Sequence, residues 1–261
     1  MTPPLSPDEA ADLHQACLSA VWEQVTAVPH LNPTLVVSPD DRVDDLCHLV
    51  ATASPFSQRT VGIAAPAQRG PRGHAKSDNL APCESHVDGS SLVDAKNACI
   101  AGWPQGSGDL GNRLFRSAER AFRAGAEGVI LLGADSPTLP AVHLTQAVEQ
   151  LVDHDAVMGP TEDGGYDLLG LKRCREWPSL LERIDWGTDR AADQTRRRAE
   201  EHGLRLAELP TWYDLDRFDD LRRIQYDRST LHKESKPAMA ALYALIQTLI
   251  ERHDSCRNSP A

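Results

Sequence analysis

The sequence predicts an α/β fold in which a mainly parallel sheet carries helices on both faces. Segments with helical spacing of apolar residues alternate with short apolar runs along most of the chain. The run at 128–133 is apolar throughout, as central strands of parallel sheets are. Amphipathic segments of helical length lie directly before and after it, which favours connections that cross over the sheet.

Each predicted element has its own local signal. The first helix is indicated by the capping-box pair Ser6 and Glu9, with Pro7 in the first turn, and the third ends at Gly125. Helices are expected at 6–28, 40–53, 109–124, 141–152, 189–202, shortly after Asp216, and at 236–252. Strands are expected at 34–38, 60–65, 128–133, 155–159, 166–171 and 204–209.

The chain is organised as one catalytic domain with additions. Residues 1–225 form the predicted domain, and 54–98 interrupt it as a flexible insertion, because Ser, Gly, Pro, His and charge replace any periodicity there. Residues 226–261 are a helical extension, which docks either on the domain or on a partner.

Composition excludes several classes of partner. The chain has 27 basic and 38 acidic residues, a net charge of −11, which disfavours nucleic acid and anionic membranes. It contains no apolar run near the roughly 20 residues that span a bilayer, no CxxC pair and no apolar leader, so a cytoplasmic location is expected. An acidic protein can still bind a nucleotide if a divalent cation screens the phosphates.

Asp135 is the leading candidate for a metal ligand. It follows the predicted central strand, at the edge where open α/β sheets bind their ligands. A carboxylate there can hold Mg²⁺ or Mn²⁺ against a diphosphate. The alternative is that Asp135 only shapes the turn or caps the next helix.

A second candidate loop joins the strands at 155–159 and 166–171. Glu162 and Asp163 could accept a proton from an attacking hydroxyl or bind sugar hydroxyls, and Asp163 is taken as the catalytic base. Gly164 and Gly165 would let backbone approach a substrate, and Tyr166 could stack on it or hydrogen-bond to it. The alternative is an ordinary hairpin turn.

The glycine-rich segment 105–111 leads into a helix, where backbone amides can bind phosphate. Gly106, Asp109 and Arg113 are therefore substrate-binding candidates. The GK[ST] ending of a phosphate-binding P-loop is absent. From the sequence alone, capping of the helix is favoured over ligand binding for Asp109, and an ordinary surface position is commoner for an arginine such as Arg113.

Further candidates lie nearer the C-terminus. Asp216, within a group of aspartates at 214–220, is a candidate second metal ligand, although helix capping would explain at least one of these acids. Trp186 and Thr188 precede a predicted helix and are assigned to substrate binding, with capping by Thr188 as the alternative.

Five motifs, taken in order, resemble a bacterial family related to glycosyltransferase A enzymes, known as DUF2064 and also as arsenosugar-biosynthesis-type glycosyltransferases. The motifs are QGSGDLGNR at 105–113, LLGADSPTLP at 131–140, GPTEDGGYDLLGL at 159–171, IDWGT at 184–188 and LPTWYDLDRFDDL at 209–221. The resemblance implies a Rossmann-like, glycosyltransferase A-like sheet of the nucleotide-diphospho-sugar transferase type. It also implies that Asp135 and Asp216 bind the metal and that the segment 162–165 lines the sugar or acceptor site.

One departure from the family concerns the start of the chain. Relatives begin with an apolar strand and a loop of the form K-x-P-x-x-G-x-x-K-T-R-L, whereas residues 5–10 resemble the segment after that loop. Either the start codon is placed too late, or the strand is lacking, in which case nucleotide affinity should be poor.

The sequence thus indicates a metal-dependent enzyme that transfers a glycosyl group from a nucleotide sugar to a small acceptor. One alternative is a nucleotidyltransferase that joins an NTP to a phosphorylated acceptor and releases pyrophosphate. Another is a catalytically degenerate binding protein. A homodimer is compatible with the sequence, which leaves the donor, the acceptor and the oligomeric state open.

Overall fold

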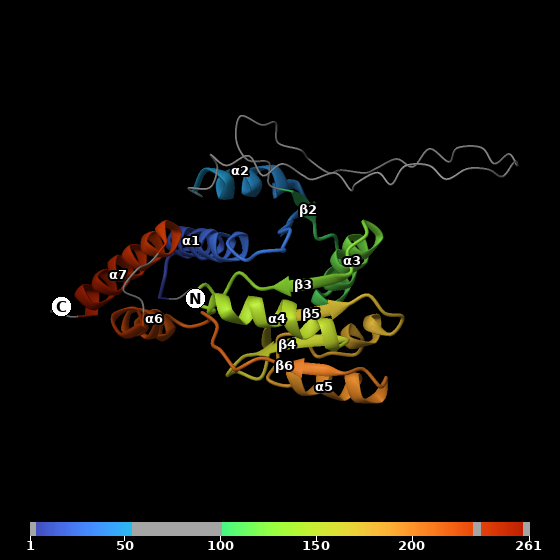
Figure 1. Cartoon of the computed structure of the whole chain (residues 1–261). Helices are drawn as coiled ribbons and strands as arrows, with labels where there is room; N and C mark the ends of the chain where they lie inside the picture. The colour runs from blue at the N-terminus through green and yellow to red at the C-terminus, as the bar shows by residue number, and fades with distance from the viewer. Residues whose placement is uncertain (1–3, 54–100, 232–235, 258–261) are drawn as a thin grey trace, which may run out of the picture.

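The computed structural model describes residues 4–53, 101–231 and 236–257. Its centre is a four-stranded sheet with the order β3-β5-β4-β6 (Figure 1). β3 and β4 both run antiparallel to β5, and β6 runs parallel to β4. Three of the four strands therefore point the same way, and β5 is the reversed one. The α/β class is confirmed, and the sheet is partly mixed.

The helices form where apolar spacing and capping residues predict them. Ser6 accepts a hydrogen bond from the Glu9 amide at 3.2 Å, and the Glu9 carboxylate accepts one from the Ser6 amide at 2.9 Å, so the capping box is present. The helices are α1 (Pro7–Thr26), α2 (Val43–Ala53), α3 (Leu110–Arg123), α4 (Ala141–Asp153), α5 (Ala191–Glu201), α6 (Phe218–Leu231) and α7 (Pro237–Arg257). The short 3-10 helices η1 (Asp40–Arg42) and η3 (Trp177–Leu181) complete them.

The strands match their predicted positions with two differences. They are β1 (Leu35–Val37), β2 (Gly102–Pro104), β3 (Gly128–Leu132), β4 (Ala156–Pro160), β5 (Tyr166–Lys172) and β6 (Leu206–Glu208). β2 lacks a sequence signal because it has only three residues, two of them Gly and Pro. β5 is antiparallel because a connection of five residues is long enough for a hairpin and too short for a crossover. The predicted strand at 60–65 and the insertion at 54–98 lie outside the described residues.

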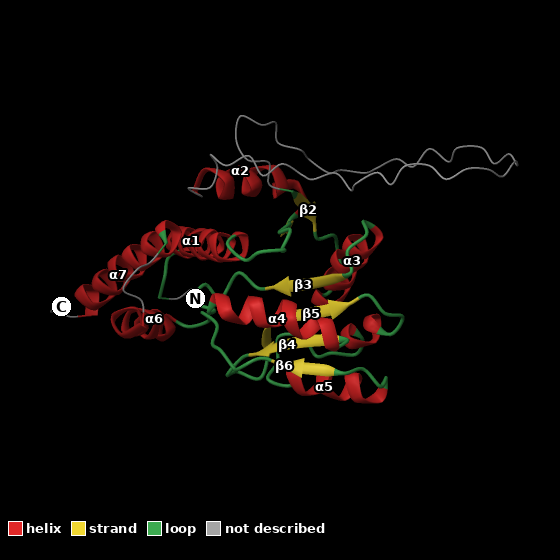
Figure 2. Ribbon diagram, in the orientation of Figure 1, coloured by secondary structure: helices red, strands yellow, loops and turns green. Residues whose placement is uncertain are grey.

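Both faces of the four-stranded sheet are covered by helices (Figure 2). On one face, apolar residues of α3, α5 and η3 pack with Met158 and Leu169. On the other face, α4 and the residues after α1 pack with Val157 and Leu168. Alternate residues of β4 and β5 thus contribute to opposite halves of the core, which explains why both strands are almost entirely buried.

A second core joins the two ends of the described chain. Apolar residues of α1, α6 and α7 pack together, with Leu242 and Ile246 of α7 fully buried. The carboxylate of Glu23 in α1 accepts a hydrogen bond at 3.0 Å from the amide of Ala238, in the first turn of α7. The C-terminal helix therefore docks on the domain through α1 and α6, and residue 225, the expected boundary, falls inside α6.

β1 and β2 form a separate parallel pair, with α2 packed against it. Among the described strands, β3 has β5 as its only partner, so its other edge is open. Its residues are apolar throughout, yet all are at least partly exposed. No described helix is both long and apolar enough to cross a membrane.

Candidate functional site

The candidate site lies where the carboxyl ends of β3, β4 and β6 meet. Asp135 follows β3, Asp163 lies in the hairpin after β4, and Asp214 and Asp216 follow β6. Backbone hydrogen bonds join these three segments: the Leu215 amide donates to the Asp135 carbonyl at 2.8 Å, and the Glu162 amide donates to the Trp212 carbonyl at 3.0 Å. Ligands of open α/β sheets bind at this edge, as the sequence predicted for Asp135.

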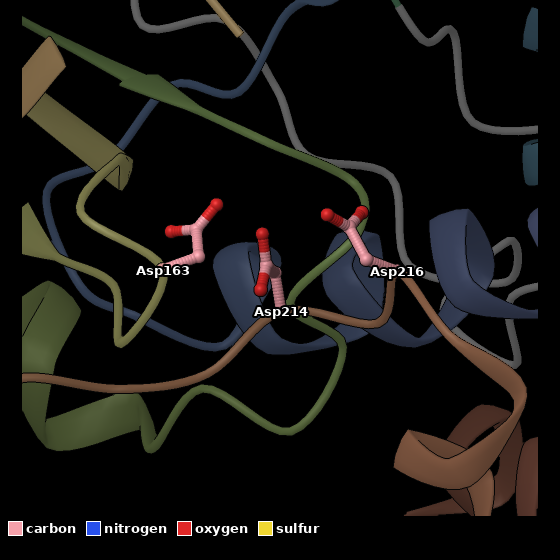
Figure 3. Close-up of side chains that lie close together, drawn as sticks. All are labelled: Asp163, Asp214 and Asp216. Atoms are coloured by element: carbon pink, nitrogen blue, oxygen red, sulfur yellow. The ribbon is translucent and has the colours of Figure 1, made fainter. Parts of the chain in front are cut away.

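Three carboxylates converge in the site. Each of Asp163, Asp214 and Asp216 offers a carboxylate oxygen, and these oxygens all lie within 4.8 Å of one another. Figure 3 shows Asp163 on one side and Asp216 on the other, with their carboxylates turned toward that of Asp214 between them. Oxygen ligands of this kind suit the hard cations Mg²⁺ and Mn²⁺.

The mutual repulsion of these acids is visible in their pKa values. Burial, together with the charges of Asp216 and Asp163, raises the pKa of Asp214 to about 6. Burial and the charges of Asp135 and Asp163 also raise the pKa of Asp216. Because Asp135 acts on both residues, it belongs to the same electrostatic cluster, and a divalent cation would relieve the repulsion.

Asp163 is fixed by its own loop. Its Oδ1 accepts a hydrogen bond at 2.5 Å from the Thr161 hydroxyl and another at 3.0 Å from the Gly165 amide. Gly164 adopts a φ of +89°, and a Cβ there would lie 2.2 Å from the Asp189 carbonyl oxygen, so glycine is required at this position. The segment is a hairpin turn, as one reading of the sequence predicted, and the turn also delivers Asp163 to the carboxylate cluster.

Glu162 and Tyr166 have partners inside the protein. Glu162 forms a bidentate ion pair with Arg223 of α6, at 2.6 and 2.8 Å, and the Arg223 guanidinium lies 3.8 Å from the centre of the Tyr213 ring. The buried Tyr166 hydroxyl accepts a hydrogen bond from Thr195 at 3.3 Å, and burial raises its pKa. The Tyr166 ring packs edge-on against Trp186. Their assignment to substrate binding stays a prediction.

The glycine-rich segment before α3 is held by side chains of the protein itself. Asp109 caps α3 by accepting a hydrogen bond from the Asn112 amide at 2.8 Å. Arg113 donates from Nε to the Gly108 carbonyl at 3.0 Å, and the Gly106 amide donates to Asp40 at 2.8 Å. These contacts give Asp109 and Arg113 structural roles, while ligand binding by all three predicted residues stays a prediction.

Thr188 and Asp220 also form hydrogen bonds within the protein that stabilise a turn or a helix start. The Thr188 hydroxyl donates to the Asp185 carbonyl at 2.7 Å and accepts from the Arg190 amide at 3.3 Å, so it stabilises the turn before α5. Asp220 accepts hydrogen bonds from the amides of Asp216 and Arg217, as expected for one helix-capping acid in this group.

Two acids of the site were missing from the predicted set. Asp214 was recognised only as one of a group of aspartates, and its role depends on a loop conformation that sequence spacing does not encode. Asp167 carried a clearer signal, because it is a charged residue at the start of the otherwise apolar strand β5. It is 7% exposed, and burial is the main cause that raises its pKa to about 7.

Comparison with known proteins bears on the family and on the fold. Residues 80–188 match the family described as "Uncharacterized protein conserved in bacteria (DUF2064)". No curated protein matches the chain. A crystal structure of a "putative nucleotide-diphospho-sugar transferase" from Desulfovibrio desulfuricans G20 superposes with a TM-score of 0.62 at 21% identity, covering 92% of this chain and 86% of the other. The family assignment made from the motifs is therefore supported over residues 80–188, on a fold that this chain shares with the Desulfovibrio protein.

Proposed function

We propose that the protein is a metal-dependent transferase that uses a nucleotide-activated donor, and that it moves a glycosyl group from a nucleotide sugar to a small acceptor. The observation that carries this proposal is the convergence of Asp163, Asp214 and Asp216, with Asp135 beside them, at the carboxyl ends of β3, β4 and β6. The fold shared with a protein named as a nucleotide-diphospho-sugar transferase supports the choice of donor.

The residues present fit a divalent cation. Asp135 and Asp216 would hold Mg²⁺ or Mn²⁺, with Asp163 and Asp214 as further oxygen donors. A bound cation would neutralise the charge that develops on the departing diphosphate. The chain's own part is to hold these acids in place through the hairpin, the contact between Leu215 and Asp135, and the cap that Asp220 places on α6.

The role of Asp163 can be stated more narrowly. One of its oxygens already accepts hydrogen bonds from Thr161 and Gly165. These hydrogen bonds fix the orientation of the carboxylate, which can still offer an oxygen to a cation. Within this proposal Asp163 is therefore first a cation ligand, and its role as catalytic base stays a prediction.

A thermal-shift panel tests the proposal. Nucleotide sugars and NTPs are added with Mn²⁺ to the wild type and to Asp135→Ala, because a ligand that binds the native state raises the melting temperature by mass action. We expect one nucleotide sugar to stabilise the wild type only when Mn²⁺ is present, with the shift lost in Asp135→Ala. Asp219→Asn, an exposed acid on α6, is the matched control and should behave as wild type.

The product released then decides among the functions. Release of a nucleoside diphosphate from the stabilising sugar donor supports glycosyl transfer. Pyrophosphate release from an NTP would show a nucleotidyltransferase instead. A folded protein that no nucleotide stabilises would refute the enzyme hypothesis for this chain and leave a binding role.

A further inference from the structure

The carboxyl group of Asp167 is buried without a partner. The residue is 7% exposed, and neither carboxylate oxygen has a hydrogen-bond partner among the described residues. Ser136 lies near enough to lower the pKa of Asp167, yet no hydrogen bond of normal geometry joins the two, and the Ser136 hydroxyl is itself buried and unpaired. Buried polar groups are nearly always hydrogen-bonded, so a carboxyl in this state points to a ligand that the protein chain itself does not supply.

Asp167 lies near two acids of the candidate site, Asp135 and Asp214. The charges of Asp135 and Asp214 both act on its carboxyl group and oppose its ionisation. The Gly133 amide donates to the Asp167 carbonyl at 2.9 Å, which holds the start of β5 against the segment that leads to Asp135. Because Asp135 is exposed and Asp167 is buried, the pair extends the carboxylate cluster from the surface into the protein.

Two glycines make room for these two carboxylates. A Cβ at Gly133 would lie 2.3 Å from Oδ1 of Asp135, and a Cβ at Gly159 would lie 2.9 Å from Oδ1 of Asp167. Neither glycine has a positive φ, so conformational freedom does not explain their presence. The space that they leave is used by carboxylate oxygens, which indicates a local arrangement built around the two acids.

Buried acids that repel one another need either a proton or a cation. Protonation would neutralise Asp167, but it would bring no positive charge to Asp135 and Asp214, whose charges act on it. A divalent cation would satisfy the oxygens of Asp167 and Asp135 together and would screen Asp214 as well. Carboxylates alone select hard ions such as Mg²⁺ and Mn²⁺ over softer metals.

We propose that Asp167 and Asp135 hold a second divalent cation, beside the first one that Asp216, Asp163 and Asp214 hold, and that Asp135 is a ligand of both. The inference deepens the proposed function and rests on it, since both place cations in the same cluster. Two-metal sites occur in enzymes that cleave phosphate esters and anhydrides, where they bind both sides of the bond that breaks. The donor class that fits such a pair is a nucleotide bearing a diphosphate or triphosphate.

Titration with Mn²⁺ alone, in the absence of any nucleotide, tests the inference. Free Mn²⁺ is followed by electron paramagnetic resonance while the metal is added to the full chain at pH 8. The wild type should bind about two equivalents, as a two-metal site requires. Asp167→Asn, which keeps the size of the side chain and removes its charge, should bind about one, and the control Asp219→Asn should again bind two.

A second variant keeps the inference testable if Asp167→Asn fails to fold. Gly133→Ala displaces only the end of the exposed Asp135 side chain, so the protein should fold normally and still lose at least the second equivalent. Melting curves in EDTA report whether each variant is folded. Two equivalents retained in both folded variants, or one or none in the wild type, would overturn the second site.

The test separates this inference from the proposed function. Loss of one equivalent in Asp167→Asn supports the second site even if no nucleotide sugar ever binds. Binding of a nucleotide sugar by a protein that takes up a single Mn²⁺ would support the proposed function and refute the second site.

Discussion

At the scale of single residues, the acids of this protein fall into two groups, one with lowered and one with raised pKa values. Glu162, Asp155 and Glu208 each accept hydrogen bonds from an arginine or from backbone, and their pKa values are lowered. The pKa values of Asp167, Asp214 and Asp216 are raised instead, because burial and one another's charges oppose ionisation. The contrast separates acids that stabilise the fold from acids that are available to a ligand.

The raised pKa of Asp167 leads to a prediction on stability and pH. The pKa rises from 3.8 to about 7, so between these values the folded protein keeps a proton that the unfolded chain has lost. This residue's contribution to stability is therefore favourable at low pH, falls as the pH rises through that window, and levels off above about 7. Asp214 acts in the same direction up to about pH 6.

Comparison of Asp167→Asn with the wild type isolates this contribution. Urea unfolding in EDTA at pH 5 and pH 8 gives the free energy of unfolding of each protein. The free energy of unfolding of the variant minus that of the wild type should increase by roughly 2.6 kcal/mol between pH 5 and pH 8, since each pH unit inside the window corresponds to about 1.4 kcal/mol. His143, whose pKa is lowered by burial, works in the opposite direction but cancels in the comparison. A difference that is the same at both pH values would contradict the assignment.

At the scale of helices and strands, local signals account for most of what could be predicted. The capping box at Ser6 and the cap at Asp109 set the starts of α1 and α3, and apolar spacing sets their extent. β2 could not be predicted, because pairing with β1 and packing against α2 stabilise a segment with no strand propensity of its own. The reversed direction of β5 follows from loop length and could have been anticipated.

The site was predictable only in part, because part of it depends on tertiary contacts rather than on local sequence signals. Asp135, Asp163 and Asp216 could be recognised because each follows a strand that the sequence predicts. Asp167 carried a signal as a charged residue in an apolar run, but spacing along the chain does not record which acids lie near it. The central place of Asp214 depends on the contact between the hairpin and the loop after β6, where the Glu162 amide donates to the Trp212 carbonyl.

Two variants of Asp109 can distinguish its structural role as a helix cap from a role in ligand binding. Asp109→Ala should lower the free energy of unfolding by about 1 kcal/mol, because the Asn112 amide loses its acceptor. Asp109→Ser retains an oxygen that can cap the helix and should restore most of that loss. The same two variants, tested in the nucleotide panel, show whether Asp109 also binds donor: reduced binding in a fully stable Asp109→Ser would assign it to the ligand.

At the scale of the whole molecule, the two ends of the described chain stabilise each other. α7 packs against α1 and α6, so the N-terminal helix is completed by residues more than 200 positions away. The segment that carries Asp214 and Asp216 leads directly into α6 and is thus connected to this helical core. Loss of packing at α7 should therefore weaken the fold as a whole.

Ile246→Ala measures that contribution. The side chain is fully buried, and its removal should lower the free energy of unfolding by about 2–5 kcal/mol through lost burial and the cavity left behind. Thr248→Ala, exposed on the same helix, should change it by less than about 0.5 kcal/mol. Chemical unfolding followed by circular dichroism gives both values, and equal effects would show that α7 does not contribute to the folded core.

The open edge of β3 bears on how the protein behaves in concentrated solution. Within residues 4–53, 101–231 and 236–257, no strand pairs with the outer edge of β3, and an apolar edge of this kind can pair with a second copy of itself. The net charge of −11 opposes this association, because two copies repel each other. Salt weakens this repulsion, since the Debye screening length falls from about 30 Å at 0.01 M to about 10 Å at 0.1 M. Ionic strength therefore sets the colloidal stability of this molecule, and light scattering should increase as salt is added.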